Sequence, residues 1–272
     1  FLGEAMTDAS GNWALGPVAN SDPDGTRLDV YFTFETATYG STVPNRVVVR
    51  QNGFDYAWTT RGFPTWDVPD GDQWVSAGGV DWTTDWYPGI WLFHDMARAW
   101  EYVTTVGGTE PGSIIIRWEP NVNSMGFCDG PCYLPIASPN GVFIPDADSD
   151  TPDTVVHEIG HRYRHNALGV WFFTDIPAYL GCIQHYMFNL MPNQRCAWSE
   201  GWADYFALII NSQINANDWC YDYNGLGPCS PGSDDLESQG WWDARVANGI
   251  VGDYVEGRVA GALWDTTDYY ND

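Results

Sequence analysis

The sequence predicts an α+β fold, in which an N-terminal β-sandwich is followed by a mainly helical domain with a small sheet. Residues 1–80 contain short runs of β-branched and aromatic residues, separated by turn-forming clusters rich in Gly, Asn and Asp. Beyond residue 87, apolar residues recur with helical spacing over longer stretches. Residues 61–87 are rich in Pro, Gly, Asp and Trp, which is the composition of a linker. We therefore expect two domains, at 1–80 and 81–272.

The N-terminal domain is expected to contain five short strands. They lie at 3–7, 13–15, 28–34, 46–50 and 56–60. The stretch Thr7-Asp8-x-x-Gly11-x-Trp13 resembles a hairpin of transthyretin-like, carboxypeptidase-regulatory-like β-sandwich modules, and an ordinary hairpin is the alternative. In those modules other strands precede this hairpin, whereas this chain begins almost on it. We therefore expect a sandwich that is truncated, or one completed by an upstream segment or by a strand from a neighbouring copy.

The second domain is expected to open with a helix at 88–106, which a Gly-Gly pair ends. Strands are expected at 113–119 and 141–145, because both runs are rich in β-branched residues. A small sheet beside helices completes the predicted α+β class.

Four aspartates precede the next predicted helix. Their alternation suits a Ca²⁺-binding loop, since calcium takes oxygen ligands. The alternative is a solvated loop in which Thr151 or Asp153 caps the helix. The aspartates are Asp146, Asp148, Asp150 and Asp153.

The stretch His157-Glu158-Ile159-Gly160-His161 is the strongest motif in the chain. Residues four apart lie on one face of a helix, so both imidazoles can reach a single ion. Glu158 follows the first histidine and can point at a water on that ion. This H-E-x-x-H arrangement is typical of zinc hydrolases. The alternative is a helix whose histidines only pack or form hydrogen bonds.

A second predicted helix, opened by Ser199 as a plausible N-cap, carries Glu200 and Asp204 one turn apart. Two histidines and a glutamate form one of the usual ligand sets of catalytic zinc. Asp204 can accept a hydrogen bond from the second ring nitrogen of His157 and so fix its tautomer. An acidic helix start exposed to solvent is the alternative.

These motifs resemble the gluzincin metallopeptidases, the thermolysin and fungalysin-like group. The resemblance rests on H-E-x-x-H, on Ser-Glu-Gly-Trp-x-Asp-Tyr-Phe from Ser199, and on the Arg258–Asp265 stretch. It implies a zincin-type catalytic domain, with zinc ligands at His157, His161 and Glu200. It further implies that Glu158 is the general base and that Asp204 supports a ligand.

Two departures from that group stand out. The segment 162–199 between His161 and Glu200 is longer, and no histidine follows His185. The group's transition-state histidine therefore has no counterpart, and the oxyanion donor would be Arg258 or a tyrosine.

The composition limits which kinds of partner the protein can bind and whether it can cross a membrane. The formal net charge is −25 and all 11 basic side chains are Arg, so the surface repels nucleic acid and anionic lipid. Halophilic adaptation is an alternative cause of this acidity. No apolar run approaches the length of a membrane helix. The start at Phe1, without a signal-like segment, is expected of a mature or excised portion.

Six cysteines, an even number, indicate an oxidising compartment, so we expect a secreted or cell-surface protein. Six cysteines allow 15 pairings, of which local pairing is the simplest. The local pairs are Cys128/Cys132, Cys182/Cys196 and Cys220/Cys229.

Three functions remain open. The first is a zinc metalloendopeptidase acting on a protein or peptide substrate. The second is a non-catalytic extracellular structural or assembly subunit with a peptidase-like fold. The third is a zinc hydrolase acting on other amides or on glycoconjugates. The expected cofactors are Zn²⁺ and, for the aspartate loop, Ca²⁺.

Overall fold

The structure is a computed structural model of the whole chain. It describes residues 5, 12–17, 28–29, 31–39, 44–49, 57–61, 67–68, 87–107, 112–124, 128–135, 141–168, 182, 190–212, 220–221, 234–236 and 252–267. The chain divides into two compact units. The first contains Phe1–Glu35 and Ala57–Asp81, and the second contains Thr36–Tyr56 and Trp82–Asp272.

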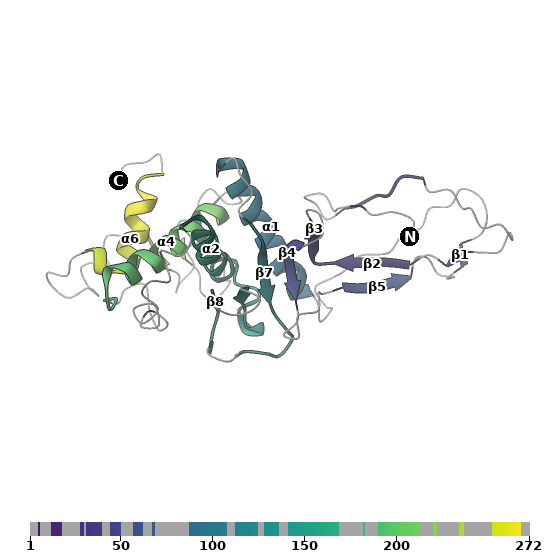
Figure 1. The fold of residues 1–272 in the computed structure, drawn as a ribbon, viewed down its shortest axis with the longest axis horizontal. Helices are drawn as coiled ribbons and strands as arrows, with labels where there is room; N and C mark the ends of the chain where they lie inside the picture. Colours follow the sequence, from purple (N-terminus) through teal and green to yellow (C-terminus); the bar gives the residue numbers. More distant parts are fainter. Residues whose placement is uncertain are drawn as a thin grey trace. The chain divides into compact units, whose positions relative to one another are not determined.

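The second unit is built on a five-stranded sheet with the order β3-β4-β7-β9-β8. These strands are β3 (Ala37–Tyr39), β4 (Pro44–Val49), β7 (Ile114–Arg117), β8 (Cys132–Leu134) and β9 (Gly141–Phe143). The three central strands are parallel, and β3 and β8 are antiparallel edges. Parallel neighbours need a crossover, which α1 (Tyr87–Gly107) supplies between β4 and β7. The second unit is therefore the predicted mixture of helices and a small sheet (Figure 1).

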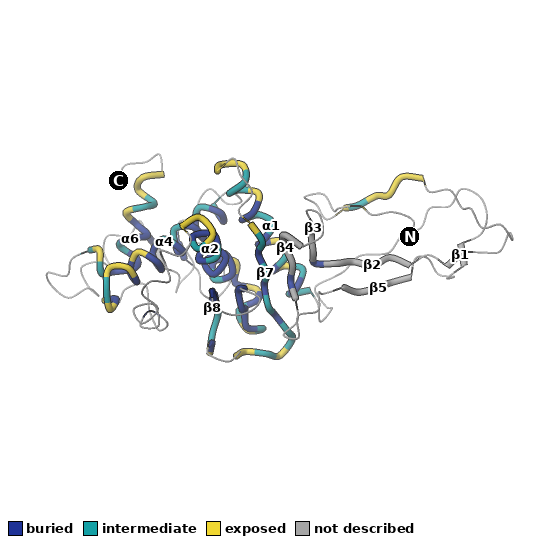
Figure 2. Tube along the Cα trace, in the orientation of Figure 1, coloured by how far each residue is buried: buried dark blue, intermediate teal, exposed yellow. Residues whose placement is uncertain are grey.

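Helices α1, α2 (Pro152–Leu168), α4 (Gln194–Asn211) and α6 (Glu256–Trp264) form the helical part of this unit. Dark blue stretches in Figure 2 mark the buried residues along the helices. The core includes Leu92 and Met96 of α1 and Ile114 and Ile116 of β7, all fully buried. Each such side chain stabilises the fold by about 1.5–3 kcal/mol. The helix expected at 88–106 is confirmed within one residue at each end.

Two glycines let α2, α4 and α6 approach closely. A Cβ on Gly201 of α4 would lie 2.4 Å from the backbone oxygen of Glu256, which begins α6. A Cβ on Gly160 of α2 would lie 3.0 Å from the ring of Phe206 in α4. The first contact is with backbone that cannot turn aside, so Gly201 is needed for the α4–α6 packing.

The predicted start of the second motif helix is wrong. Helix α4 begins at Gln194, and its N-cap is Asn193, whose side chain accepts a hydrogen bond from the backbone N–H of Cys196. Asn caps as well as Ser does, so either residue fits the local pattern. Ser199 lies inside the helix, where its hydroxyl has another partner.

Helix α2 begins at Pro152, a residue favoured at the first helical position. A 3₁₀ turn, η1 (Asp146–Asp148), precedes it. The Thr151 hydroxyl donates to the backbone oxygen of Asp148, 2.6 Å away, so it tightens this turn.

The described residues of the first unit form two antiparallel ribbons. One pairs β1 (Leu28–Asp29) with β6 (Asp67–Val68), and the other pairs β2 (Tyr31–Glu35) with β5 (Ala57–Arg61). The strand predicted at 46–50 is β4, which instead joins the sheet of the second unit together with β3, a strand that was not predicted.

The predicted N-terminal β-sandwich is therefore not supported. Local alternation identifies a strand but not its partner, and β4 pairs with β7, which lies far along the chain. Of the runs proposed at 3–7 and 13–15, the first lies mostly outside the described residues and the second forms no described strand. Most of the linker proposed at 61–87 also lies outside them.

Local disulfide pairing is confirmed for Cys128–Cys132 and Cys182–Cys196. Cys220, in β10 (Cys220–Tyr221), is also disulfide-bonded, with a partner outside the described residues. Strand β10 pairs with β11 (Asp234–Asp235), and a 3₁₀ turn, η3 (Gly252–Tyr254), precedes α6. Among the described helices, none has the length and apolar character that a membrane crossing requires.

Candidate metal centre

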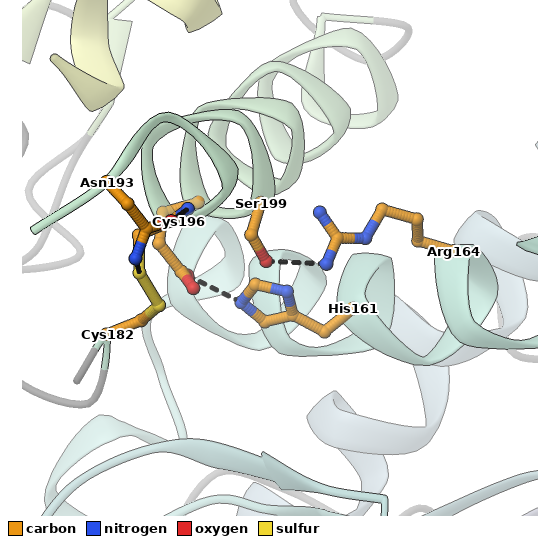
Figure 3. The surroundings of a disulfide bond; sticks show 7 residues. His161, Arg164, Cys182, Asn193, Cys196 and Ser199 are labelled. Atoms are coloured by element: carbon orange, nitrogen blue, oxygen red, sulfur yellow. Dashed lines mark hydrogen bonds and ion pairs between the residues drawn. A yellow bond between two sulfur atoms is a disulfide. The ribbon is translucent and has the colours of Figure 1, made fainter. Parts of the chain in front are cut away.

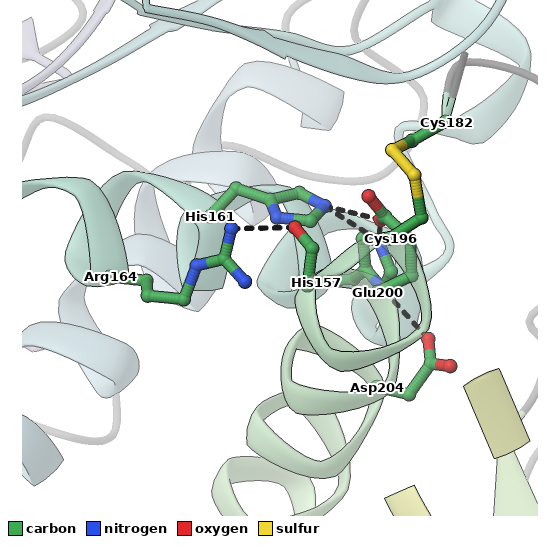
Figure 4. A network of polar contacts seen from close by, with 8 residues as sticks. His157, His161, Arg164, Cys182, Cys196, Glu200 and Asp204 are labelled. Carbon is green, nitrogen blue, oxygen red and sulfur yellow. Dashed lines mark hydrogen bonds and ion pairs between the residues drawn. A yellow bond between two sulfur atoms is a disulfide. The ribbon is translucent and has the colours of Figure 1, made fainter. Parts of the chain in front are cut away.

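Helices α2 and α4 bring together three atoms of kinds that can bind a metal ion. Nε2 of His157 and Nε2 of His161 lie 3.1 Å apart. Oε2 of Glu200, on α4, lies 3.3 Å from the first of these nitrogens and 2.8 Å from the second. All three side chains are buried, and Figure 4 shows them converging between the two helices.

Asp204 lies one turn after Glu200 and contacts the opposite side of the first imidazole. Its Oδ1 is 2.7 Å from Nδ1 of His157. A carboxylate accepts, so Nδ1 of His157 is the nitrogen that carries the proton. In the neutral ring, the lone pair of Nε2 is then directed at His161 and Glu200, which is the orientation that a ligand needs.

Glu158 contributes a second carboxylate near the histidines. His157, Glu158 and His161 each present a ligand atom, and these atoms lie within 4.8 Å of one another. The 2.8 and 3.3 Å contacts of Glu200 are much shorter. Glu200 therefore makes the contacts expected of a ligand, and Glu158 is a neighbouring carboxylate.

Residues 97–272 match the family described as the mycolysin C-terminal domain. The match spans more than half of the chain and includes α2, α4 and α6. The chain belongs to the mycolysin C-terminal domain family. No curated protein matches it. Membership places the chain in a thermolysin-like metallopeptidase context, in agreement with the gluzincin resemblance. Mycolysin-related proteins are secreted, and the disulfides of this chain agree with that compartment.

The pKa of His157 shows the electrostatic balance at this site. Burial alone lowers the pKa of the imidazole, because it disfavours the charged form. Hydrogen bonds to Asp204 and Glu200, with the negative charges of Asp204 and Glu158, outweigh burial and raise the pKa of His157 well above its ordinary value. A divalent cation would occupy the same negative field and replace the ring proton.

Arg258, predicted as an oxyanion donor, lies on α6. Its Cδ is 3.5 Å from the place where a Cβ on Gly252 would lie. That contact does not tie the guanidinium to the three converging atoms. The catalytic role of Arg258 therefore stays a prediction.

Protein donors engage two of the aspartates of the predicted calcium loop. Asp146 accepts hydrogen bonds from Nε1 of Trp118, at 3.1 Å, and from the backbone N–H of Asn121, at 2.8 Å. Asp153 accepts one from Nδ2 of Asn211. Burial, and then the charge of Asp150, raise the pKa of Asp148. The calcium loop stays a prediction.

Two features of the centre were not anticipated. The Tyr221 ring meets the His157 ring edge-on, with centroids 6.1 Å apart. Nη2 of Arg164 donates to Oγ of Ser199 at 2.6 Å, one residue before Glu200 (Figure 3). The position of Tyr221 beside the disulfide-bonded Cys220 is the one sequence signal for these contacts. The partners of Tyr221 and of Arg164 are known only from the fold.

Proposed function

We propose that this chain is a secreted or cell-surface zinc-dependent peptidase. The observation that carries the proposal is the convergence of Nε2 of His157, Nε2 of His161 and Oε2 of Glu200 within 3.3 Å. The family context supports the same class of enzyme.

The donor set fits zinc. With bonds of about 2.0–2.1 Å, two ligand atoms on a tetrahedral zinc ion lie roughly 3.3 Å apart. The three separations, 3.1, 3.3 and 2.8 Å, are close to this value. Two imidazoles and one carboxylate also leave a fourth position open, as in catalytic rather than structural zinc sites.

The chemistry divides between the ion and this chain's own residues. Zinc held by His157, His161 and Glu200 would supply Lewis acidity toward a peptide carbonyl and toward water. Glu158 takes the proton of the attacking water and passes it to the leaving amine. Asp204 holds the tautomer of His157 during the reaction. Burial of these groups strengthens each electrostatic contact.

The proposed substrate is a protein or an extended peptide. Strand β8 is an edge of the sheet, and its Tyr133 hydroxyl is hydrogen-bonded to Nδ1 of His165 at the end of α2. An extended peptide pairing with an edge strand is bound through its backbone, which tolerates many sequences. The strong negative charge of the chain argues against nucleic acid as a partner.

The test is Glu158→Gln in the full chain, with Glu101→Gln on the exposed face of α1 as the matched control. We expect Glu158→Gln to retain one zinc and to lose at least about 100-fold in peptidase rate, the scale of general-base catalysis. Glu101→Gln should retain both zinc and activity. Zinc content is measured by elemental analysis and the rate with a quenched peptide library.

The same experiment separates the peptidase from a non-catalytic assembly subunit. A chain that holds zinc but cleaves no peptide, with or without Glu158, would support the subunit. A chain that cleaves other amides but not peptides would support the third function. Undiminished cleavage by Glu158→Gln would contradict the proposed role of that residue.

A further inference from the structure

A buried polar contact joins the two metal-bearing helices beside the proposed ligands. Arg164 lies three residues after His161 on α2 and is buried, with 5% of its surface exposed. Its Nη2 donates to Oγ of Ser199 at 2.6 Å, and Ser199 immediately precedes Glu200 on α4. Figure 3 shows the guanidinium reaching across from α2 to meet the hydroxyl. The contact therefore links a neighbour of one ligand to a neighbour of another.

Polar contacts at the site and the bond from Asn211 to Asp153 also join these helices, and the packing between them is otherwise apolar, with little directional preference. Gly160 faces Phe206, and the rings of Tyr163 and Phe206 meet edge-on with centroids 5.4 Å apart. Apolar packing resists separation of two helices more than it resists a small slide of one along the other. A charged hydrogen bond has a preferred length and angle, so it opposes such a slide.

Burial of a guanidinium does not by itself raise the free energy of unfolding. Removing a charge from water is costly, and apolar replacements of buried charged groups often leave stability unchanged or raise it. A role in fixing geometry accounts better for Arg164. Small displacements matter here, because zinc affinity depends on ligand atoms held within a few tenths of an ångström.

We propose that Arg164 and Ser199 are positioning residues for Glu200, which set the register of α4 against α2 so that the carboxylate meets both imidazoles. This inference rests on the proposed zinc site. Neither residue touches the ion or the substrate in this account.

The test compares Ser199→Ala and Arg164→Met with Asn211→Ala in the full chain. Asn211 is the matched control, because its Nδ2 donates to Asp153 and joins the same two helices at their far ends. The readouts are zinc affinity by chelator competition, the visible spectrum of the Co²⁺-substituted protein, and unfolding of the zinc-free protein. Ser199→Ala removes one oxygen atom, so it decides the test if Arg164→Met does not fold.

We expect Ser199→Ala and Arg164→Met to weaken zinc binding by about tenfold, the lower end of the effect of losing groups that orient ligands. Their cobalt spectra should change in intensity. Asn211→Ala should lower stability and leave zinc affinity and the spectrum unchanged. Wild-type affinity and spectra in both variants, with only stability lost, would overturn the inference. A wild-type chain that binds no zinc would overturn the proposed function, and this inference with it.

Discussion

At the scale of single residues, Asp204 sets the tautomer and the orientation of the His157 ring. Its carboxylate accepts a hydrogen bond from Nδ1 at 2.7 Å, so in the neutral ring it is Nε2, facing Glu200, that has the free lone pair. The pairing was predictable, because helical spacing places Glu200 and Asp204 on one face of α4. The contact between Arg164 and Ser199 was not, because it joins residues 35 apart in sequence through the packing of two helices.

Replacing Asp204 with Asn tests this arrangement. Asp204→Asn keeps the shape of the side chain but removes the charge that holds the Nδ1 proton. We expect zinc affinity to fall by about 10–100-fold, as is usual when a partner of a zinc-bound histidine is changed. Chelator competition measures it, and Asp150→Asn, on an exposed position, is the control. Equal zinc affinity in both variants would remove Asp204 from the account.

At the scale of elements, the sequence predicts helices better than sheets. The limits of α1 follow from its apolar spacing and its final glycines, and the H-E-x-x-H spacing predicts α2. Helix contacts are local, so a short window contains the information. Strand β4 looks like any alternating strand, and only the fold shows that it pairs with β7 instead of completing a sandwich.

The α4–α6 contact gives a prediction at this scale. Gly201→Ala would place a Cβ 2.4 Å from the backbone oxygen of Glu256 and 2.7 Å from Cβ of Val259, so one helix must move. Overpacking of this kind costs about 1–3 kcal/mol in the free energy of unfolding. Denaturant unfolding measures the change.

Gly130→Ala is the control for that variant, because a Cβ there would meet nothing within 4 Å. Its free energy of unfolding should stay within about 0.5 kcal/mol of the wild-type value. If the two alanine variants unfold alike, the close approach of α4 and α6 is wrong.

At the scale of the whole molecule, the proposed zinc site would couple metal binding to folding. His157, His161, Glu158, Glu200 and Asp204 are all buried, and a bound cation would offset part of the charge of the three carboxylates. The disulfide Cys182–Cys196 ends one turn before Glu200 and ties a distant segment to α4. Stability and metal binding should therefore respond together to conditions.

The pH dependence of unfolding should reverse when zinc is added. In the zinc-free protein the pKa of His157 is raised above its unfolded value, so this stabilisation is complete below the unfolded pKa and is lost as pH rises through the folded pKa. Zinc needs the neutral ring, so the stability that zinc adds grows as pH rises over the same range. Denaturant unfolding of chelator-treated and zinc-loaded protein at a series of pH values measures both trends. Parallel trends in the two samples would contradict this coupling.

Anomalous X-ray diffraction at the zinc absorption edge tests the central claim most directly. Crystals of the zinc-loaded chain should show one strong peak bonded to Nε2 of His157, Nε2 of His161 and Oε2 of Glu200, at about 2.0–2.2 Å from each atom. A peak bound elsewhere, a peak whose ligands do not include Glu200, or no peak at all would contradict the account.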